Sequence, residues 1–511
     1  MRRIFCCEGC MRSIIYILGW ILLIVAVMMV MPMAVAAIYM ETEGFAFLGT
    51  AALSAILGFI LIKTRPETIR FQAKEGLACT ALGWIVMSII GAVPLTVSGE
   101  IPSYLDAVFE TVSGFTTTGA SILPNVELMT KTTNMWRCFT HWIGGMGILV
   151  FLLAVLPLVG GTNMQLMKAE SPGPSVGKLV PKVRFTAQLL YMLYIALTVL
   201  MILMLLIGRM PLYDAMCTAF GTAGTGGFGI YADSCASFSP YVQWVITVFM
   251  ILFGVNFNVY YLLFLRQFRA AAKCEEMRWY LGIIVVAALL IYRSTASMYG
   301  SIEEGLRTSF FQVGTIITTT GFSTVDFNLW PTFSKIIILM LMFVGACAGS
   351  TGGGLKVSRI AIAGKSFFTY IGSFLHPRAV RKVKFEGKEV EMDTLKAIFV
   401  YFVGVMLIVV LSILIVSLDN FDLETTVSAV AATFNNIGPG FGAAGPAACY
   451  ADFSPISKLV MIFDMLAGRL EVFPLVLLLT PRFWRELVSE YRSRRMRIGR
   501  SFIDGEPKSQ R

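Results

Sequence analysis

The chain carries TTTGAS at residues 116–121, TGGFG at 225–229, TTTGFS at 318–323 and NNIGPG at 435–440. Each stretch closes a short, moderately apolar segment, and each lies between apolar runs long enough to cross a bilayer. The same order of parts occurs four times, so we interpret the stretches as copies of one unit. A unit repeated in this way can surround one axis with backbone carbonyl oxygens. The pattern therefore predicts a membrane protein that conducts an ion.

The composition is that of a polytopic, all-helical membrane protein. Of 511 residues, 57% are hydrophobic and 14% are charged, and the mean hydropathy is +0.75. Soluble domains of this length contain far more charge. The net charge of +10 does not indicate nucleic acid as a partner, because Lys and Arg lie in short segments between apolar runs. Such a distribution reports membrane topology instead.

The apolar runs predict a fold of four repeats behind an N-terminal hairpin. Residues 1–76 contain two runs without a glycine unit, Ile14–Met40 and Phe45–Ile62. The expected repeats are 77–184, 185–278, 279–394 and 395–511, each with a membrane helix, a pore half-helix, a glycine turn and a second membrane helix around one pore. The expected first helices are Leu77–Val97, Phe185–Ile207, Trp279–Ile291 and Leu395–Leu418. The expected half-helices are Tyr104–Phe115, Leu212–Ala223, Ile302–Ile317 and Leu423–Phe434. The expected second helices are Met135–Val159, Tyr241–Leu265, a run from Lys335 and Ile456–Thr480.

Basic residues predict the orientation. Most of the 41 Lys and Arg lie before the first helix, in the loops that begin at Lys63, Leu158 and Arg266, between Lys365 and Lys396, and after Pro481. Cytoplasmic segments are rich in Lys and Arg, so both termini are expected in the cytoplasm. The segment from Arg378 to Lys388 and the tail Arg492–Arg500 are the most basic, and they are expected to contact lipid head groups or a cytosolic partner.

The glycine turns are suited to a dehydrated potassium ion. A filter replaces the water oxygens of the ion with protein oxygens of similar number and field strength. Glycine lets carbonyls point inward because it has no Cβ, and each half-helix would end with a partial negative charge near the axis. A single turn of this kind would be explained better as a helix C-cap, but four with the same neighbours favour a pore. The predicted potassium site, with the ion at the four turn glycines, comprises Thr117, Thr118, Gly119, Thr225, Gly226, Gly227, Thr319, Thr320, Gly321, Asn436, Ile437 and Gly438.

Two further features lie outside the turns. GSTGGG at 349–354 interrupts the last apolar run of the third repeat, Ile336–Ala348, so a regular helix is not expected there. A packing kink is one explanation. Arg469 lies in an apolar run with Asp464 and Glu471. A charge near the bilayer centre costs roughly 2.5 to 3.5 kcal/mol, so this side chain should face water or a partner, and a salt bridge with either acid is one explanation.

These stretches, with HWIGGMGILVF after the first turn and GACAGSTGGGLKVSR after the third, resemble the Trk/Ktr/HKT superfamily, most closely its TrkH-type potassium uptake subunits. The resemblance covers nearly the whole chain. It implies that the four turns form the selectivity filter of a single-subunit pore in the cell inner membrane. In that superfamily a serine in the first turn is associated with sodium, and this chain has Gly119. TAGTGGFG departs most from the pattern, and the choice of Gly227 over Gly226 rests on aligning Phe228 with Phe322.

The resemblance also implies a gate and partners. The glycine-rich loop would lie across the pore below the filter, and an arginine would project into the cavity there. The implied gate comprises Gly349, Ser350, Thr351, Gly352, Gly353, Gly354, Lys356 and Arg469. The protein is expected to be a homodimer, docked on a TrkA-type ring of nucleotide-binding cytosolic subunits.

Two other classes of protein are alternatives to a potassium channel. A secondary transporter that couples potassium to protons or sodium stays open as an alternative, although four repeats in the same orientation disfavour inverted-repeat transporters. An enzyme is not expected, because the chain has only His141 and His376, no GxSxG and no metal-ligand cluster. No covalent cofactor is expected, and potassium would be the transported substrate.

Overall fold

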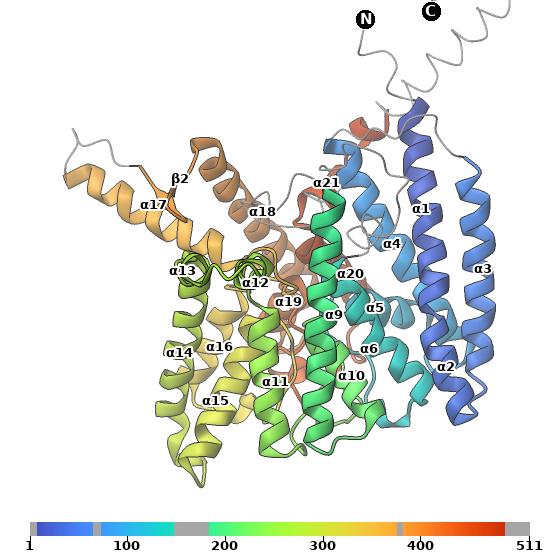
Figure 1. Ribbon diagram of the computed structural model, residues 1–511, viewed down its shortest axis with the longest axis horizontal. Coiled ribbons are helices and arrows are strands. Elements are labelled where there is room, and N and C mark those ends of the chain that lie inside the picture. Colours follow the sequence, from blue (N-terminus) through green and yellow to red (C-terminus); the bar gives the residue numbers. More distant parts are fainter. Residues whose placement is uncertain (1–7, 65–72, 148–182, 376–381, 486–511) are drawn as a thin grey trace, which may run out of the picture.

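The computed structural model describes residues 8–64, 73–147, 183–375 and 382–485, where the chain forms helices and one small hairpin (Figure 1). The first part contains α1 (Glu8–Met28), α2 (Val30–Tyr39) and α3 (Gly44–Ile62). Next come α4 (Ala73–Val97), α5 (Tyr104–Phe115) and α6 (Lys131–Met146). These are followed by α9 (Val183–Ile207), α10 (Leu212–Ala223), α11 (Pro240–Phe253), α12 (Phe257–Phe264) and α13 (Phe268–Ala272). The third group is α14 (Glu275–Thr295), α15 (Ile302–Ile317), α16 (Thr332–Met342) and α17 (Val357–Leu375). The strands β1 (Lys384–Phe385) and β2 (Lys388–Glu389) precede α18 (Met392–Val416), α19 (Leu423–Phe434), α20 (Pro455–Leu470) and α21 (Phe473–Leu479).

The helices are those of a membrane protein. Within the described residues, six helices are long and apolar enough to cross a bilayer, or seven if α11 and α12 count as one bent span. Large apolar side chains are exposed on the outer faces of α3 and α18, for example Phe45, Phe59 and Met406. An apolar surface of this extent is stable when lipid covers it. The expected all-helical, multi-pass class is therefore confirmed.

The four short helices α5, α10, α15 and α19 have the bounds expected from the sequence. Three begin with a polar side chain that accepts a backbone N–H of the first turn, which is the usual N-cap arrangement. These N-caps are Ser103, Ser301 and Asp422. The hydrogen bond from Thr425 holds the pKa of the Asp422 carboxyl below its usual range. Three of the four short helices thus begin at a capping side chain, and all four end at one of the glycine turns.

Several expected membrane helices are broken, and those predictions were wrong in this respect. Tyr241–Leu265 was expected as one run, but α11 ends at Phe253 and α12 leaves it at 92°. In the third group, α16 ends at Met342, six residues before the expected end. The run Ile456–Thr480 is interrupted between α20 and α21, where Glu471 and Val472 have φ of 63° and 56°. Apolar composition sets how long a segment stays in lipid but does not require one straight helix.

A small hairpin lies where only a basic loop was expected. β1 and β2 pair antiparallel, with Lys384 opposite Glu389. Phe385 is buried against Ile362 of α17 and Ile398 of α18, so the hairpin has a small core of its own. Arg378 and Arg381, the end of the run Met135–Val159, most of the loop after Lys63 and the tail Arg492–Arg500 lie outside the described residues.

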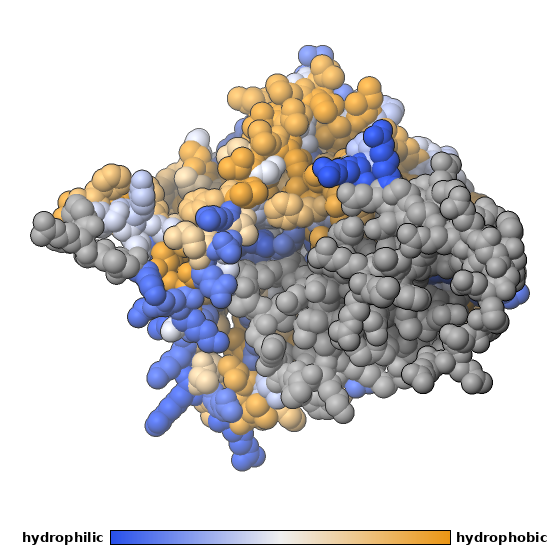
Figure 2. Space-filling model, turned by 90° about the horizontal axis from the view of Figure 1, so that it is seen from above, coloured by the Kyte–Doolittle hydropathy of each residue, from blue (hydrophilic) through white to orange (hydrophobic). Residues whose placement is uncertain are grey.

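The hairpin and α17 lie in the upper part of the molecule, where α1 begins and α21 lies, and α12 and α13 lie below them (Figure 1). Seen from this end, hydrophilic residues gather on part of the described surface beside hydrophobic stretches (Figure 2). Lys382, Lys384 and Lys388 of the hairpin segment are exposed there. This end of the molecule, the polar end, thus carries exposed charged side chains.

Candidate functional site

The four turns share one backbone geometry. After each short helix, the last residues form two hydrogen bonds that define a Schellman cap. In the first turn, the N–H groups of Thr117 and Thr118 donate to the carbonyls of Gly114 and Ser113 at 3.1 and 2.8 Å. The same pair of bonds ends α10, α15 and α19. The left-handed residue of each cap is not glycine, and these residues are Thr117, Thr225, Thr319 and Asn436, with φ between 54° and 58°.

The turn glycines therefore have a different task from helix capping. Gly119 follows two residues after the cap residue and has φ of 80°. A Cβ added there would collide with the carbonyl oxygen of Gly226 in the second turn. The matching collisions are Gly227 with the oxygen of Thr320, Gly321 with that of Ile437 and Gly438 with that of Thr118. Each turn thus packs against the next, and the fourth packs against the first, which closes a ring.

The second turn has two adjacent glycines for two reasons. Gly227 has φ of 78° and meets the third turn, so it corresponds to Gly119. Gly226 occupies the position of Thr118, but a Cβ there would collide with the ring of His141. The alignment of Phe228 with Phe322 therefore selects the glycine whose geometry matches the other turns.

Carbonyl oxygens of two other turns lie close to Gly119. The Cβ position of Gly119 lies 3.7 Å from the oxygen of Thr320, which belongs to the third turn and not to the neighbouring second turn. Oxygens of two other turns therefore face the same spot. The carboxyl-terminal ends of the four short helices add partial negative charge there. The geometry offers a cation neutral oxygen ligands and a favourable potential.

Side chains brace the turns from behind. Thr116 and Thr118 share a hydrogen bond at 2.8 Å, and the third turn has the equivalent pair, Thr318 and Thr320, at 2.7 Å. In the fourth turn, the amide of Asn436 donates to the Thr118 hydroxyl at 2.9 Å. The Tyr450 hydroxyl donates to the Gly438 carbonyl at 2.7 Å, which occupies part of that oxygen's accepting capacity. Behind the second turn, the pKa of Tyr231 is raised to about 12, mainly by its hydrogen bond to Asp214.

The loop between α16 and α17 lies directly against the third and fourth turns. The N–H of Gly353 donates to the Thr319 hydroxyl at 2.6 Å. A Cβ on Gly352 would come within 2.9 Å of the Thr318 oxygen, and a Cβ on Gly353 within 3.0 Å of the Asn435 oxygen. Side chains do not fit at this contact, which explains the glycines. The N–H of Val357 donates to the carbonyl of Ala346 at 3.1 Å and closes the neck of the loop.

Two cationic side chains hold this loop. Lys356 is buried and donates to the carbonyl of Gly352 within the loop. Arg469 of α20 donates to the Thr351 carbonyl at 2.9 Å and to the Thr117 hydroxyl at 3.2 Å. It also donates to the carbonyls of Gly144 and Gly145 at the end of α6.

Asp464 and Glu471 have partners of their own. Glu471 pairs with Arg359, and Asp464 accepts a hydrogen bond from Ser412 at 2.8 Å. The contacts of Arg469 with Thr351 and Thr117 connect α20 to both the loop and the first turn.

The break between α11 and α12 was not predicted from the sequence. Its backbone groups form hydrogen bonds with the loop between α16 and α17, on the side away from the turns. The N–H groups of Cys347 and Thr351 donate to the carbonyls of Gly254 and Phe253 at 3.1 and 3.4 Å. The N–H of Phe257 donates to the Gly349 carbonyl at 3.1 Å. Interrupted helices expose backbone groups that must find partners inside a membrane, and here the two breaks satisfy each other. Gly254 and Asn256 were the signal within the expected run.

Glu276, at the start of α14, connects the α11–α12 break with the loop between α16 and α17. The sequence analysis did not predict this role. Its carboxylate accepts the N–H of Ala348 at 2.7 Å and the side-chain amide of Asn256 at 3.4 Å. Glu276 is buried, and it lines a cavity of about 610 Å³ beside the hairpin. Its backbone N–H donates to Glu386 of the hairpin at 3.0 Å. The loop is therefore connected to the polar end of the molecule through α14.

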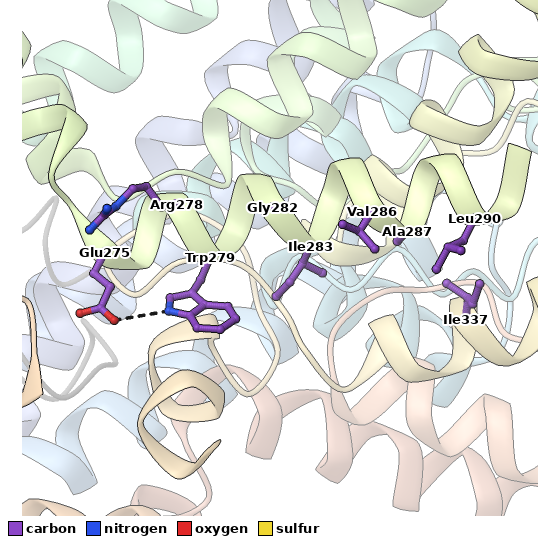
Figure 3. A pocket seen from close by; sticks show the side chains of 9 residues that line it. All are labelled: Glu275, Arg278, Trp279, Gly282, Ile283, Val286, Ala287, Leu290 and Ile337. Atoms are coloured by element: carbon purple, nitrogen blue, oxygen red, sulfur yellow. Dashed lines mark hydrogen bonds between the residues drawn. The ribbon is translucent and has the colours of Figure 1, made fainter. Parts of the chain in front are cut away.

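A separate groove of about 660 Å³ lies along α14, and Figure 3 shows its lining side chains. Glu275, Arg278 and Trp279 form one end, and the remainder is apolar. Its lining residues come from α14 and α16 and include none of the ring residues. In the part of the chain that the structure describes, no three His, Cys, Asp or Glu side chains are grouped to hold a metal ion.

The predicted site residues are brought together in two layers. The twelve turn residues form the ring, and Thr351, Gly352, Gly353, Lys356 and Arg469 lie against it or hold the loop to it. Gly349 and Ser350 lie on the side of the loop that faces the α11–α12 break, where the Ser350 hydroxyl donates to the Cys347 carbonyl.

The chain is similar to known proteins over most of its length. Residues 43–485 match the TrkH family, described as cation transport proteins. The chain is 36% identical to the Trk system potassium uptake protein TrkH of Salmonella typhimurium, over 93% of this chain and 99% of that protein. It is 32% identical to the Trk system potassium uptake protein TrkG of Escherichia coli, with the same coverage. The crystal structure of the potassium transporter TrkH from Vibrio parahaemolyticus is similar, with a TM-score of 0.83 and 32% identity over 93% of this chain and 100% of that one.

Proposed function

Since the chain belongs to the TrkH family of cation transport proteins, we propose that it takes up potassium across the cell membrane through the ring of four turns. Its curated relatives are named as potassium uptake proteins, and it is a transporter rather than an enzyme. The observation that carries the proposal is the closed ring, in which a carbonyl of each turn faces the glycine of its neighbour.

The ring can discriminate between ions by the geometry of its oxygens. A potassium ion at the centre would exchange water oxygens for carbonyls that are already in place, so little reorganisation is needed. In this proposal the four helix–turn units are repeats around one pore, and the filter residues are the twelve named above. The Tyr450 contact with Gly438 makes the fourth turn the one whose carbonyl is least available to the ion.

The loop at 349–354 acts as the gate in this proposal. It lies against two of the four turns, so an ion that leaves the ring on that side meets it. Lys356 and Arg469 hold it by hydrogen bonds to its carbonyls, and their charges oppose a second cation nearby. Opening would require these contacts to break.

We propose further that the polar end carrying the hairpin faces the cytoplasm, in keeping with its lysines. The relatives are subunits named for a Trk system, which supports a partner protein. A homodimer docked on a TrkA-type nucleotide-binding ring, in the cell inner membrane, is the assembly that we propose.

The test is the current through purified protein in a planar bilayer. A potassium channel gives a reversal potential that follows the potassium gradient and shifts little when sodium replaces other cations. Coupled transport gives a reversal potential that also depends on the proton or sodium gradient, and that result would replace the channel mechanism with a symporter. A protein that passes sodium as readily as potassium would contradict the proposed filter.

A further inference from the structure

A buried ion pair lies behind the first turn. The Glu110 carboxylate of α5 and the Arg137 guanidinium of α6 are 2.8 Å apart, and their side chains are 1% and 2% exposed. A pair at this depth loses its hydration, so it is retained only where its hydrogen bonds are well satisfied. Burial of this kind generally offers little net stability, which raises the question of what the pair positions.

The carboxylate holds the chain just after the turn glycine. Glu110 accepts hydrogen bonds from the Ser121 hydroxyl at 2.9 Å and from the N–H of Ile122 at 3.0 Å. Ser121 follows Gly119 by two residues. The exit of the first turn is therefore fixed to α5 through a charged acceptor, whose hydrogen bonds are stronger than neutral ones.

The guanidinium extends the same support to the second turn. Arg137 lies 4.3 Å from the centre of the Phe228 ring and 3.5 Å from the carbonyl oxygen of Gly229. It also donates to Asn134 at 2.9 Å and to the Ser121 hydroxyl at 3.3 Å. The ion pair thus contacts the segments that follow the first and second turns, which meet where Gly119 packs against Gly226.

The other turns lack an acid at this position. Glu110 lies nine residues before Gly119, and the residues nine positions before the other turn glycines are Thr218, Gln312 and Ala429. The acid that supports the exit of the first turn therefore has no counterpart at this position in the other three repeats. The Cβ position of Gly119 also approaches oxygens of both the second and the third turn.

We infer that Glu110 and Arg137 are specificity-determining positioning residues, which set the distance between the first and second turns and thereby the preference for potassium over sodium. The inference rests on the proposed function of the ring. Neither residue contacts the ion. Their effect is transmitted through Ser121, Ile122 and Phe228 to the carbonyls at the centre.

The main test is Ser121→Ala, because this change leaves the ion pair in place and removes the hydroxyl that links both charges to the turn. The sodium-to-potassium permeability ratio, measured from reversal potentials, is expected to rise by about tenfold, the scale of a hydrogen bond to a charged group. Ser323→Ala is the matched control, because Ser323 has the same position after Gly321 and Gln312 stands where the acid would be. Its ratio should not change.

Glu110→Gln provides a second variant, and it should raise the ratio at least as much if the protein folds. If it does not fold, Ser121→Ala alone decides. The inference is overturned if the wild-type protein prefers potassium and Ser121→Ala keeps the same ratio at an unchanged melting temperature. It is also overturned if Ser323→Ala alters the ratio equally. A wild-type protein that shows no preference for potassium would instead refute the proposed function of the ring.

Discussion

The ring of turns and the loop against it are in direct contact, yet they are held in different ways. In the ring, glycines pack against backbone oxygens of the next turn, so no side chain can rotate to release the contact. The loop also has glycine contacts with two turns and backbone hydrogen bonds to the α11–α12 break, but long side chains hold it as well, namely Lys356, Arg469 and Glu276. Side chains change rotamer far faster than a packed backbone rearranges. In the proposed function, the ring keeps its geometry while the loop leaves.

The two regions also differ in where backbone strain lies. Left-handed residues other than glycine cost roughly 1–2 kcal/mol each, and the ring contains one in every turn. Most positive φ values in the loop fall on glycines, such as Gly345, Gly349 and Gly354, which bear little of this cost. Strain persists only where neighbours enforce it, so the ring depends on its closure. The loop can change conformation without that constraint.

The largest effect is expected from deleting Ser350–Gly353. The deletion removes the contacts with Thr319 and Arg469, so basal potassium flux should rise about tenfold, which equals a shift of about 1.4 kcal/mol in the balance of closed and open states. Flux into proteoliposomes, measured without a partner protein, checks this. An unchanged flux with a lower melting temperature would show that the loop is only a packing kink.

Gly119→Ser tests the ring itself. The added Cβ collides with the oxygen of Gly226, so the side chain displaces an ion ligand, and the sodium-to-potassium permeability ratio should rise by roughly tenfold. Gly99→Ser is the matched control, because Gly99 has φ of 81° and open space around its Cβ position. It adds the backbone strain without the collision. Equal permeability ratios in wild type and a well-expressed Gly119→Ser protein would exclude Gly119 from the ion site.

Arg469→Ala should affect the loop more than the ring. It removes donors to Thr351 and Thr117 and a charge near the ion path, so potassium uptake should become a few-fold faster, the scale of one or two hydrogen bonds. Arg469→Lys keeps the charge and separates the two causes. Uptake and melting temperature should be measured on the same preparation. Slower uptake together with a lower melting temperature would assign Arg469 a structural role.

The smallest effect is expected at Glu276. Replacing it with Ala removes the acceptor for the Ala348 N–H, and basal flux should rise by about twofold, the lower end of what one hydrogen bond contributes. Glu276→Gln retains an acceptor oxygen and should stay close to wild type. If both variants raise flux equally, the charge rather than the hydrogen bond holds the loop. If neither does, α14 does not support the loop.

The sequence could predict the short helices and turns because local signals determine them. Capping residues such as Ser103 and Asp422 start the helices, and the glycines follow at a constant distance from the helix ends. It could not predict that Thr117 and its equivalents take the left-handed position. Threonine does not favour that conformation, and only the packing of four turns imposes it.

The contacts around the loop were harder to predict. Hydropathy does not distinguish a straight span from α11 and α12, whose break is satisfied by a loop about ninety residues further along the chain. Glu276 stood near the start of an expected helix, as surface acids commonly do. Glu110 did carry a signal, since an acid within a half-helix at membrane depth needs a partner. Identifying Arg137 as that partner required the packing of α5 on α6.

The four sides of the ring belong to one chain, and this has a genetic consequence. In an assembly of four identical subunits, one codon change would alter all four sides of such a ring. Here it alters one side only, so Gly226 can take the place that Thr118 has in the first turn while the remaining sides stay the same. In the proposed function, one mutation therefore changes the ion preference through a single turn, and the effect of each turn can be measured separately.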